Sequence, residues 1–182
     1  MADNTKSKKE LKIDTLLADV RSGNSTKAKG AIQSLKVHGD STVIEPLLRV
    51  YTDPKFEDLK GEIHAFLSDI HDETARPEFV RVAEEITELR NDVLNIVWNS
   101  KMDFSGYVDS IVALAVEGDF MTTVECLTII ENMQGPFEEM DLIECQMALA
   151  KYPEHPSKSE QKDQLISEIA LLIQDIERNI EG

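Results

Sequence analysis

The chain has 182 residues, of which 41% are hydrophobic, and this supplies enough apolar side chains for one folded domain with a core. Its formal net charge is −16, and because such a surface repels phosphate, nucleic acid and anionic membranes are excluded as expected partners. No apolar run approaches the roughly 18 residues of a membrane span, and the first residues lack the apolar stretch of a secretory signal. We therefore expect a cytoplasmic protein.

The beginning of the chain predicts a tail followed by a short helix. Residues 1–8 are polar, so we expect a disordered tail there and a single domain over residues 9–182. Apolar residues at positions 11, 16, 17 and 20 form a helical stripe that ends near Gly23, a residue suited to the end of a helix. Ser25 or Thr26 can cap the helix that follows.

Four pairs of helical segments come next, and they recur at a nearly constant spacing. Their apolar anchors, 32, 30 and 33 residues apart, are Leu35, Leu67, Val97 and Ile130. A short polar break and a second apolar segment follow each anchor, and a period in the range of about 20–50 residues is typical of arrays of supersecondary units. We predict an all-α chain whose repeats cover about residues 25–54, 55–87, 88–118 and 119–152.

Residues 158–181 predict one longer helix with a different role. Its apolar stripe includes Ile166, Ile169, Ile173, Ile176 and Ile180. The last unit of a helical array would otherwise expose its stacking face, so we expect this helix to cap the array. The isoleucines also have coiled-coil spacing, which leaves a helix offered to a second subunit as the alternative. The expected state is a monomer or a weak homodimer through this helix.

The paired segments resemble a known family. The best-matching stretch runs from Ala31-Ile32-Gln33-Ser34-Leu35 through Gly39-Asp40 to Val43-Ile44-Glu45-Pro46-Leu47-Leu48. It resembles the HEAT repeats of the armadillo-like α-solenoid family, and the resemblance extends over residues 25–152. It implies a right-handed α-solenoid of about four HEAT-like helical hairpins, with second helices lining a concave face. By analogy it also implies a protein that holds partners, although fold does not dictate function.

Residues with catalytic or metal-binding chemistry are sparse. The chain has no GxSxG, GxGxxG, Walker, HExxH or CxxC motif. His64 and His71 are seven residues apart, which places them about 10 Å apart along a helix, too far to bind one metal. Cys126 and Cys145 lie among apolar neighbours, where a free cysteine behaves as a small buried hydrophobe. We predict no catalytic residues, no cofactor and no metal.

A candidate binding surface lies where the chain has no cation. From residue 102 to residue 150 there is no Lys or Arg, against ten acids, and the segment Tyr107–Val116 is apolar nearly all round. Either the C-terminal helix covers the outer side of that segment or a partner does. Acidic and adaptable apolar side chains near it are the predicted partner-binding residues: Asp109, Glu117, Met140, Asp141, Glu144 and Met147. An apolar strip bordered by acids suits a basic peptide or helix.

The sequence therefore favours a non-enzymatic scaffold that presents an acidic and apolar concave surface to a basic segment of another protein. One alternative is a repeat-fold enzyme, a lyase or a DNA-glycosylase-like protein, although the second of these depends on a basic groove. The other is a purely structural subunit of a larger assembly. Acidity also serves solubility, so the charge alone does not decide among these alternatives. The identity of the partner, the pathway and the oligomeric state stay open.

Overall fold

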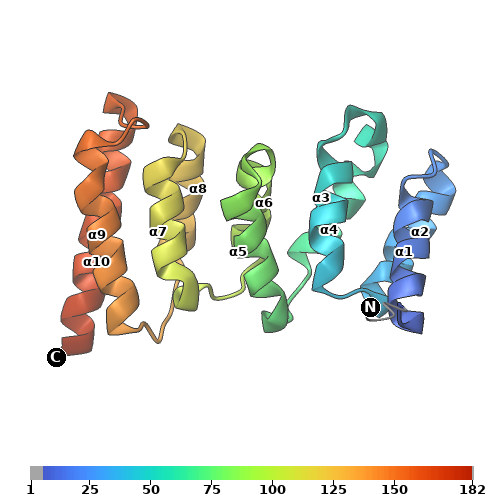
Figure 1. The fold of residues 1–182 in the computed structure, drawn as a ribbon, viewed down its shortest axis with the longest axis horizontal. Coiled ribbons are helices and arrows are strands. Elements are labelled where there is room, and N and C mark those ends of the chain that lie inside the picture. Colours follow the sequence, from blue (N-terminus) through green and yellow to red (C-terminus); the bar gives the residue numbers. More distant parts are fainter. Residues whose placement is uncertain (1–5, 182) are drawn as a thin grey trace, which may run out of the picture. The chain divides into compact units, whose positions relative to one another are not determined.

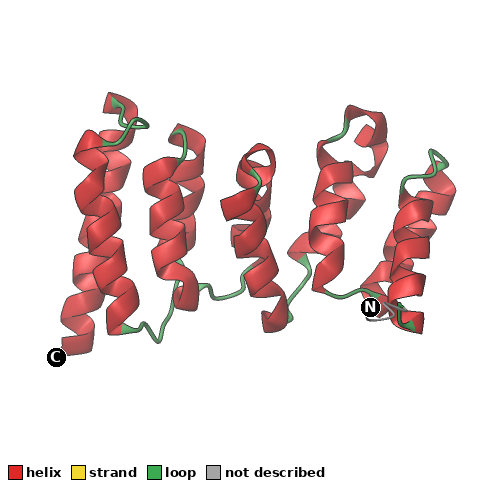
Figure 2. Cartoon of the chain, viewed as in Figure 1, coloured by secondary structure: helices red, strands yellow, loops and turns green. Residues whose placement is uncertain are grey.

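A computed structural model describes residues 6–181 of the chain. Over that range the chain forms ten α-helices and six short 3-10 helices, joined by loops and without a strand (Figure 2). The predicted all-α class is confirmed. None of the helices in the described range is long and apolar enough to cross a membrane. Residues 1–5 of the predicted disordered tail lie outside the described residues.

The chain divides into two compact units, Met1–Glu78 and Phe79–Gly182. The division falls within helix α5, Arg76–Glu85. The single domain expected from the sequence stays a prediction.

The first unit consists mainly of four helices: α1 (Lys8–Val20), α2 (Ser25–His38), α3 (Ile44–Thr52) and α4 (Lys60–Ser68). Helix α1 packs against α2, and α4 packs against both α2 and α3 (Figure 1). Ser7 and Glu10 form a capping box that starts α1 at Lys8, inside the segment predicted to be a tail. Asn24, rather than Ser25 or Thr26, caps α2 by accepting a hydrogen bond from the Lys27 amide at 3.0 Å.

The second unit contains the rest of α5 and five more helices: α6 (Arg90–Ser100), α7 (Val108–Glu117), α8 (Phe120–Glu131), α9 (Glu139–Lys151) and α10 (Glu160–Glu181). They form two layers. Helices α6, α8 and α10 pack in succession in one layer, and α7 packs beside α9 in the other. The layers meet where α7 packs on α8 and α9 on α10 (Figure 1).

The four anchors that defined the period are all buried. They occupy the corresponding helices: Leu35 lies on α2, Leu67 on α4, Val97 on α6 and Ile130 on α8. In the second unit, two of these helices, α6 and α8, are direct neighbours. The period in the sequence therefore marks helices that bury their apolar sides in the same way.

Helices that pack together are separated by the predicted repeat boundaries. The boundary between residues 118 and 119 falls between α7 and α8, and the one after residue 152 falls between α9 and α10, yet each pair is in contact. The spacing of a repeat specifies how far apart equivalent residues lie. It does not specify which of the two helices begins a unit.

The C-terminal helix α10 uses its apolar stripe inside the second unit. Ile166, Ile169 and Ile173 are buried, and α10 packs against α8 and α9. Its last isoleucine, Ile180, is exposed. Most of the stripe that had suggested contact with a second subunit is therefore occupied within the chain.

Candidate functional site

The apolar segment Tyr107–Val116 belongs to the interior of the second unit. Its helix, α7, contacts α8, α9 and α10, which cover it on different sides. The buried residues of α7 are Val108, Ile111, Val112, Leu114, Ala115 and Val116. This answers the question that the sequence left open, because the chain itself covers the segment. An exposed apolar surface lies instead on a helix that packs beside α7.

That surface lies on α9. Met140, Ile143 and Met147 are 63%, 41% and 56% exposed, and their spacing of three and seven residues places them on one side of the helix. The opposite side buries Leu142 and Cys145 in the unit. A row of large apolar side chains facing solvent is unfavourable in water, so it marks a surface suited to contact with another molecule.

An open groove of about 400 Å³ runs beside this row. Its lining residues come from three helices and are Glu84 of α5, Asp109, Ser110 and Ala113 of α7, and Glu144, Met147, Ala148 and Lys151 of α9. Its lining thus combines small and thioether side chains with three carboxylates. Among the lining residues Lys151, at the end of α9, is the one cation.

Three of the six residues predicted for partner binding, Asp109, Glu144 and Met147, line this groove together. Met140 and Asp141 lie on the first turn of α9 and do not line it. Glu117 lies at the far end of α7, in a second hollow beside the beginning of α10. The structure therefore brings half of the predicted set together, and the groove also has two charged residues that were not predicted.

The missed residues are Glu84 and Lys151. Glu84 comes from α5, so only the fold brings it beside Asp109. In a chain with 35 acidic residues, no local pattern distinguishes it. Lys151 comes directly after the cation-free stretch and marks its end.

The acids near the groove repel one another. Burial raises the pKa of Asp141 above its ordinary value, and the negative charges of Asp109 and Glu138 raise it further. Asp109 therefore acts on α9 as well as on the groove. A positive charge brought between α7 and α9 would relieve this repulsion.

The two cysteines are poor nucleophiles. Burial raises the pKa of Cys126, and burial together with Asp109 and Asp141 raises the pKa of Cys145 to about 12. Both thiols stay protonated at neutral pH, whereas the thiolate is the reactive form. Within residues 6–181, no three His, Cys, Asp or Glu side chains are placed to hold a metal ion.

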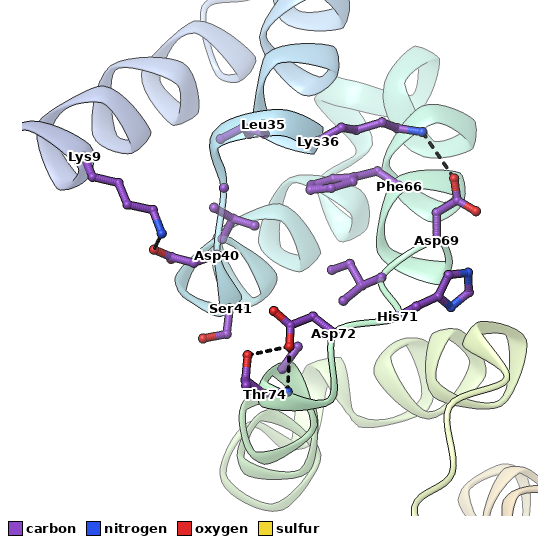
Figure 3. A pocket seen from close by; sticks show the side chains of 14 residues that line it. Lys9, Leu35, Lys36, Asp40, Ser41, Phe66, Asp69, His71, Asp72 and Thr74 are labelled. Atoms are coloured by element: carbon purple, nitrogen blue, oxygen red, sulfur yellow. Dashed lines mark hydrogen bonds and ion pairs between the residues drawn. The ribbon is translucent and has the colours of Figure 1, made fainter.

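A separate pocket of about 480 Å³ lies in the first unit, between the ends of α2 and α4 (Figure 3). Phe66 and Leu35 form part of its apolar lining. At its edge, the Lys9 ammonium pairs with the Asp40 carboxylate at 2.8 Å, and Lys36 pairs with Asp69 at 3.6 Å (Figure 3). With charges of both signs paired at its edge, this pocket does not select a ligand of one charge.

A repeated turn occurs beside this pocket and again in the second unit. Asp40, Asp72 and Asp103, 32 and 31 residues apart, each accept a hydrogen bond from the backbone amide two residues on, at 3.2, 2.9 and 2.9 Å. The residue two positions on is Thr or Ser, and its hydroxyl donates to the same carboxylate oxygen. Asp40 and Asp72 cap the 3-10 segments that lead into α3 and α5, and Asp103 lies two residues before the 3-10 segment that leads into α7. The signal in the sequence was an Asp-x-Thr/Ser pattern in each of the first three repeats.

One lysine is buried at the joint between α7 and α10. Lys162 is 1% exposed, and its ammonium donates hydrogen bonds to the carbonyl oxygens of Val116 at 3.1 Å and Gly118 at 2.7 Å. It also donates to the Ser157 hydroxyl at 3.0 Å and lies 5.3 Å from the centre of the Tyr152 ring. Burial lowers the pKa of this amine. Lys162 thus closes the C-terminal end of α7 and holds α10 against it.

Comparisons with known proteins add no family to this geometry. No family model, no curated protein and no solved structure matches the chain.

Proposed function

We propose that the chain is a cytoplasmic, non-enzymatic scaffold that binds a basic segment of a partner protein in the groove between α7 and α9. In this proposal the helices form an α-solenoid of about four HEAT-like hairpins. Helix α10 caps its C-terminal end, and the second helices line its binding face. The period of buried anchors and the two-layer packing of the second unit support this architecture.

One observation carries the proposal: the groove combines unbalanced negative charge with an exposed apolar side chain. Glu84, Asp109 and Glu144 supply three negative charges against Lys151, and Met147 is 56% exposed between them. Opposite charges guide a partner to the groove, and the methionine supplies contact area that adapts to its shape. A segment with Lys or Arg beside apolar residues satisfies both requirements.

The first experiment tests the charges. The wild-type chain and the variant Asp109→Lys/Glu144→Lys serve as baits in an extract of the native cell, and mass spectrometry identifies what each captures. The control, Glu131→Lys/Glu154→Lys, makes the same change of charge at exposed acids outside the groove. We expect a basic protein to be captured by the wild type and the control and lost from the groove variant. Equal capture by all three would contradict the proposed site.

The second experiment separates apolar contact from charge. Met147→Asp places a charge in the lining of the groove, and Met121→Asp makes the same change at a methionine of α8 that is 51% exposed. Neither side chain is in the core, so both variants should fold. We expect titration with the captured segment to show a large loss of affinity for Met147→Asp alone. Wild-type binding should also weaken as salt is raised, because the charges that guide the partner are exposed.

A further inference from the structure

Helix α1 has a solvent-facing surface that is basic and apolar. Lys8, Leu11, Lys12 and Thr15 are all exposed, and spacings of three, four and seven residues place them on one side of the helix. Leu11 is 53% exposed between the two lysines. The opposite side of α1 buries Ile13 and Val20, so the basic surface faces away from the packed interior of the unit.

Within residues 6–181, the two lysines on this surface form no ion pair, whereas their neighbours Lys6 and Lys9 do. Lys6 pairs with Asp14 at 2.6 Å, and Lys9 pairs with Asp40 at 2.8 Å. Lys8 and Lys12 form no ion pair with any residue that the structure describes. The chain therefore carries unpaired cations beside an exposed leucine on α1. On α9 it carries uncompensated acids beside exposed methionines.

We infer that the segment bound in the groove between α7 and α9 is helix α1 of a second copy of this chain. The inference rests on the proposed function, because it requires the groove to bind a basic segment. It identifies that segment by the complementarity of the two surfaces: Lys8 and Lys12 face Asp109 and Glu144, and the leucine between them contacts Met147.

The two surfaces lie on different units of the chain, so the contact is heterologous. In a pair of copies joined by one such contact, one groove and one helix α1 stay unoccupied. Further copies can therefore add to form a row, or the row can close into a ring. A single helix in a shallow groove buries less area than a stable dimer needs, so each contact is weak and forms with an affinity on the order of micromolar or weaker. Association therefore depends on concentration and, because the charges are exposed, on salt.

The test uses the full chain in sedimentation velocity over a wide range of concentrations, at low and at high salt. The weight-average mass of the wild type should rise with concentration at low salt and fall back at high salt. Lys8→Glu/Lys12→Glu should weaken association about tenfold or more, as should Asp109→Lys/Glu144→Lys, because each variant opposes like charges. The control Lys36→Glu/Lys55→Glu makes the same change elsewhere in the first unit and should associate like the wild type.

The decisive measurement uses a mixture of the two charge-reversal variants, Lys8→Glu/Lys12→Glu and Asp109→Lys/Glu144→Lys. Each variant alone opposes like charges, but in the mixture the acidic α1 of one meets the basic groove of the other, and association should return. A chain that stays monomeric at every concentration, or associates regardless of these substitutions, would overturn the inference. Either result leaves the proposed function to its own test, since capture of a basic partner through Asp109 and Glu144 does not depend on self-association.

Discussion

The buried lysine at the joint of α7 and α10 provides the sharpest test of how the second unit is held together. We predict that Lys162→Met destabilises the chain by about 2 kcal/mol. The methionine keeps the apolar stem but leaves the buried Gly118 carbonyl without its donor, a loss of about 1–3 kcal/mol. The Val116 carbonyl keeps a hydrogen bond from the Ser157 hydroxyl. Removing the charge also removes its desolvation cost, which limits the loss.

Lys162→Ala should cost more, because it also removes about three buried methylene groups at about 0.8 kcal/mol each, for a total of about 4 kcal/mol. Urea unfolding followed by circular dichroism measures both values. For a chain of this size, Lys162→Met should lower the melting temperature by about 4–8 °C. The control is Lys158→Met, which removes an exposed ion pair with Asp163 and should cost no more than about 0.5 kcal/mol.

A Lys162→Met chain as stable as the wild type would refute this reasoning. It would show that an apolar side chain serves equally well at the joint, and that the ammonium contributes nothing beyond its own desolvation cost.

Four further predictions concern other parts of the chain. Leu67→Ala should destabilise by about 2–5 kcal/mol in urea unfolding, because it opens a cavity in a fully buried site; no measurable loss would contradict its burial. The Thr122 amide, which donates to Asp119 at 2.8 Å, is the main cause that lowers the pKa of this carboxyl below 3.8. The stability that the Asp119 carboxylate contributes is therefore complete above about pH 3.8. It is lost as the pH falls through the lower pKa that this carboxyl has in the folded state. Asp119→Asn should remove the part of the acid dependence of the melting temperature that Asp119 causes. A variant whose melting temperature falls with acid as it does in the wild type would contradict this prediction. Deleting residues 157–182 should expose the faces of α8 and α9 covered by α10, which lowers the melting temperature and increases dye binding; an equally stable monomer would show that α10 is dispensable. Lys101→Gly should stabilise by about 0.5–1 kcal/mol in the same unfolding assay, since residue 101 has φ 58°, whereas a loss would mean that the lysine side chain matters there.

The buried framework could be predicted because it depends on a periodic pattern. Leu35, Leu67, Val97 and Ile130 recur at helical-repeat spacing, and burying equivalent faces of successive helices requires this pattern. Which helices pack together as pairs was harder to predict from the sequence. Contacts such as α7 with α8 depend on how units follow one another in space, and the period is the same whichever helix is counted first.

The site was predicted in part, for reasons that differ from residue to residue. Asp109, Glu144 and Met147 are brought together because they lie on two packed helices, α7 and α9, each recognisable from its own apolar pattern. Whether α7 was covered could not be predicted, because an all-apolar helix fits a core and an interface equally well. Trp98 shows the same ambiguity, because it follows an apolar pattern but is 43% exposed.

Lys162 was not predicted at all. A lysine in an amphipathic helix is normally exposed, and nothing around residue 162 indicates that two backbone carbonyls 44 and 46 residues away lack donors. Buried polar contacts of this kind depend on where helix ends meet, and this becomes apparent only when the fold is known.

The repeated aspartate turns also affect how the chain acquires its structure. Each places the signal for starting a helix within two residues of the aspartate that provides it, so the entry to a helix forms without waiting for distant segments. Contacts between residues close in sequence shorten the conformational search, and helical chains dominated by them fold in microseconds to milliseconds. The same arrangement makes the chain tolerant of changes in length. If one period between Asp40 and Asp72 were excised or duplicated, each remaining aspartate turn would still lie directly before its own helix entry.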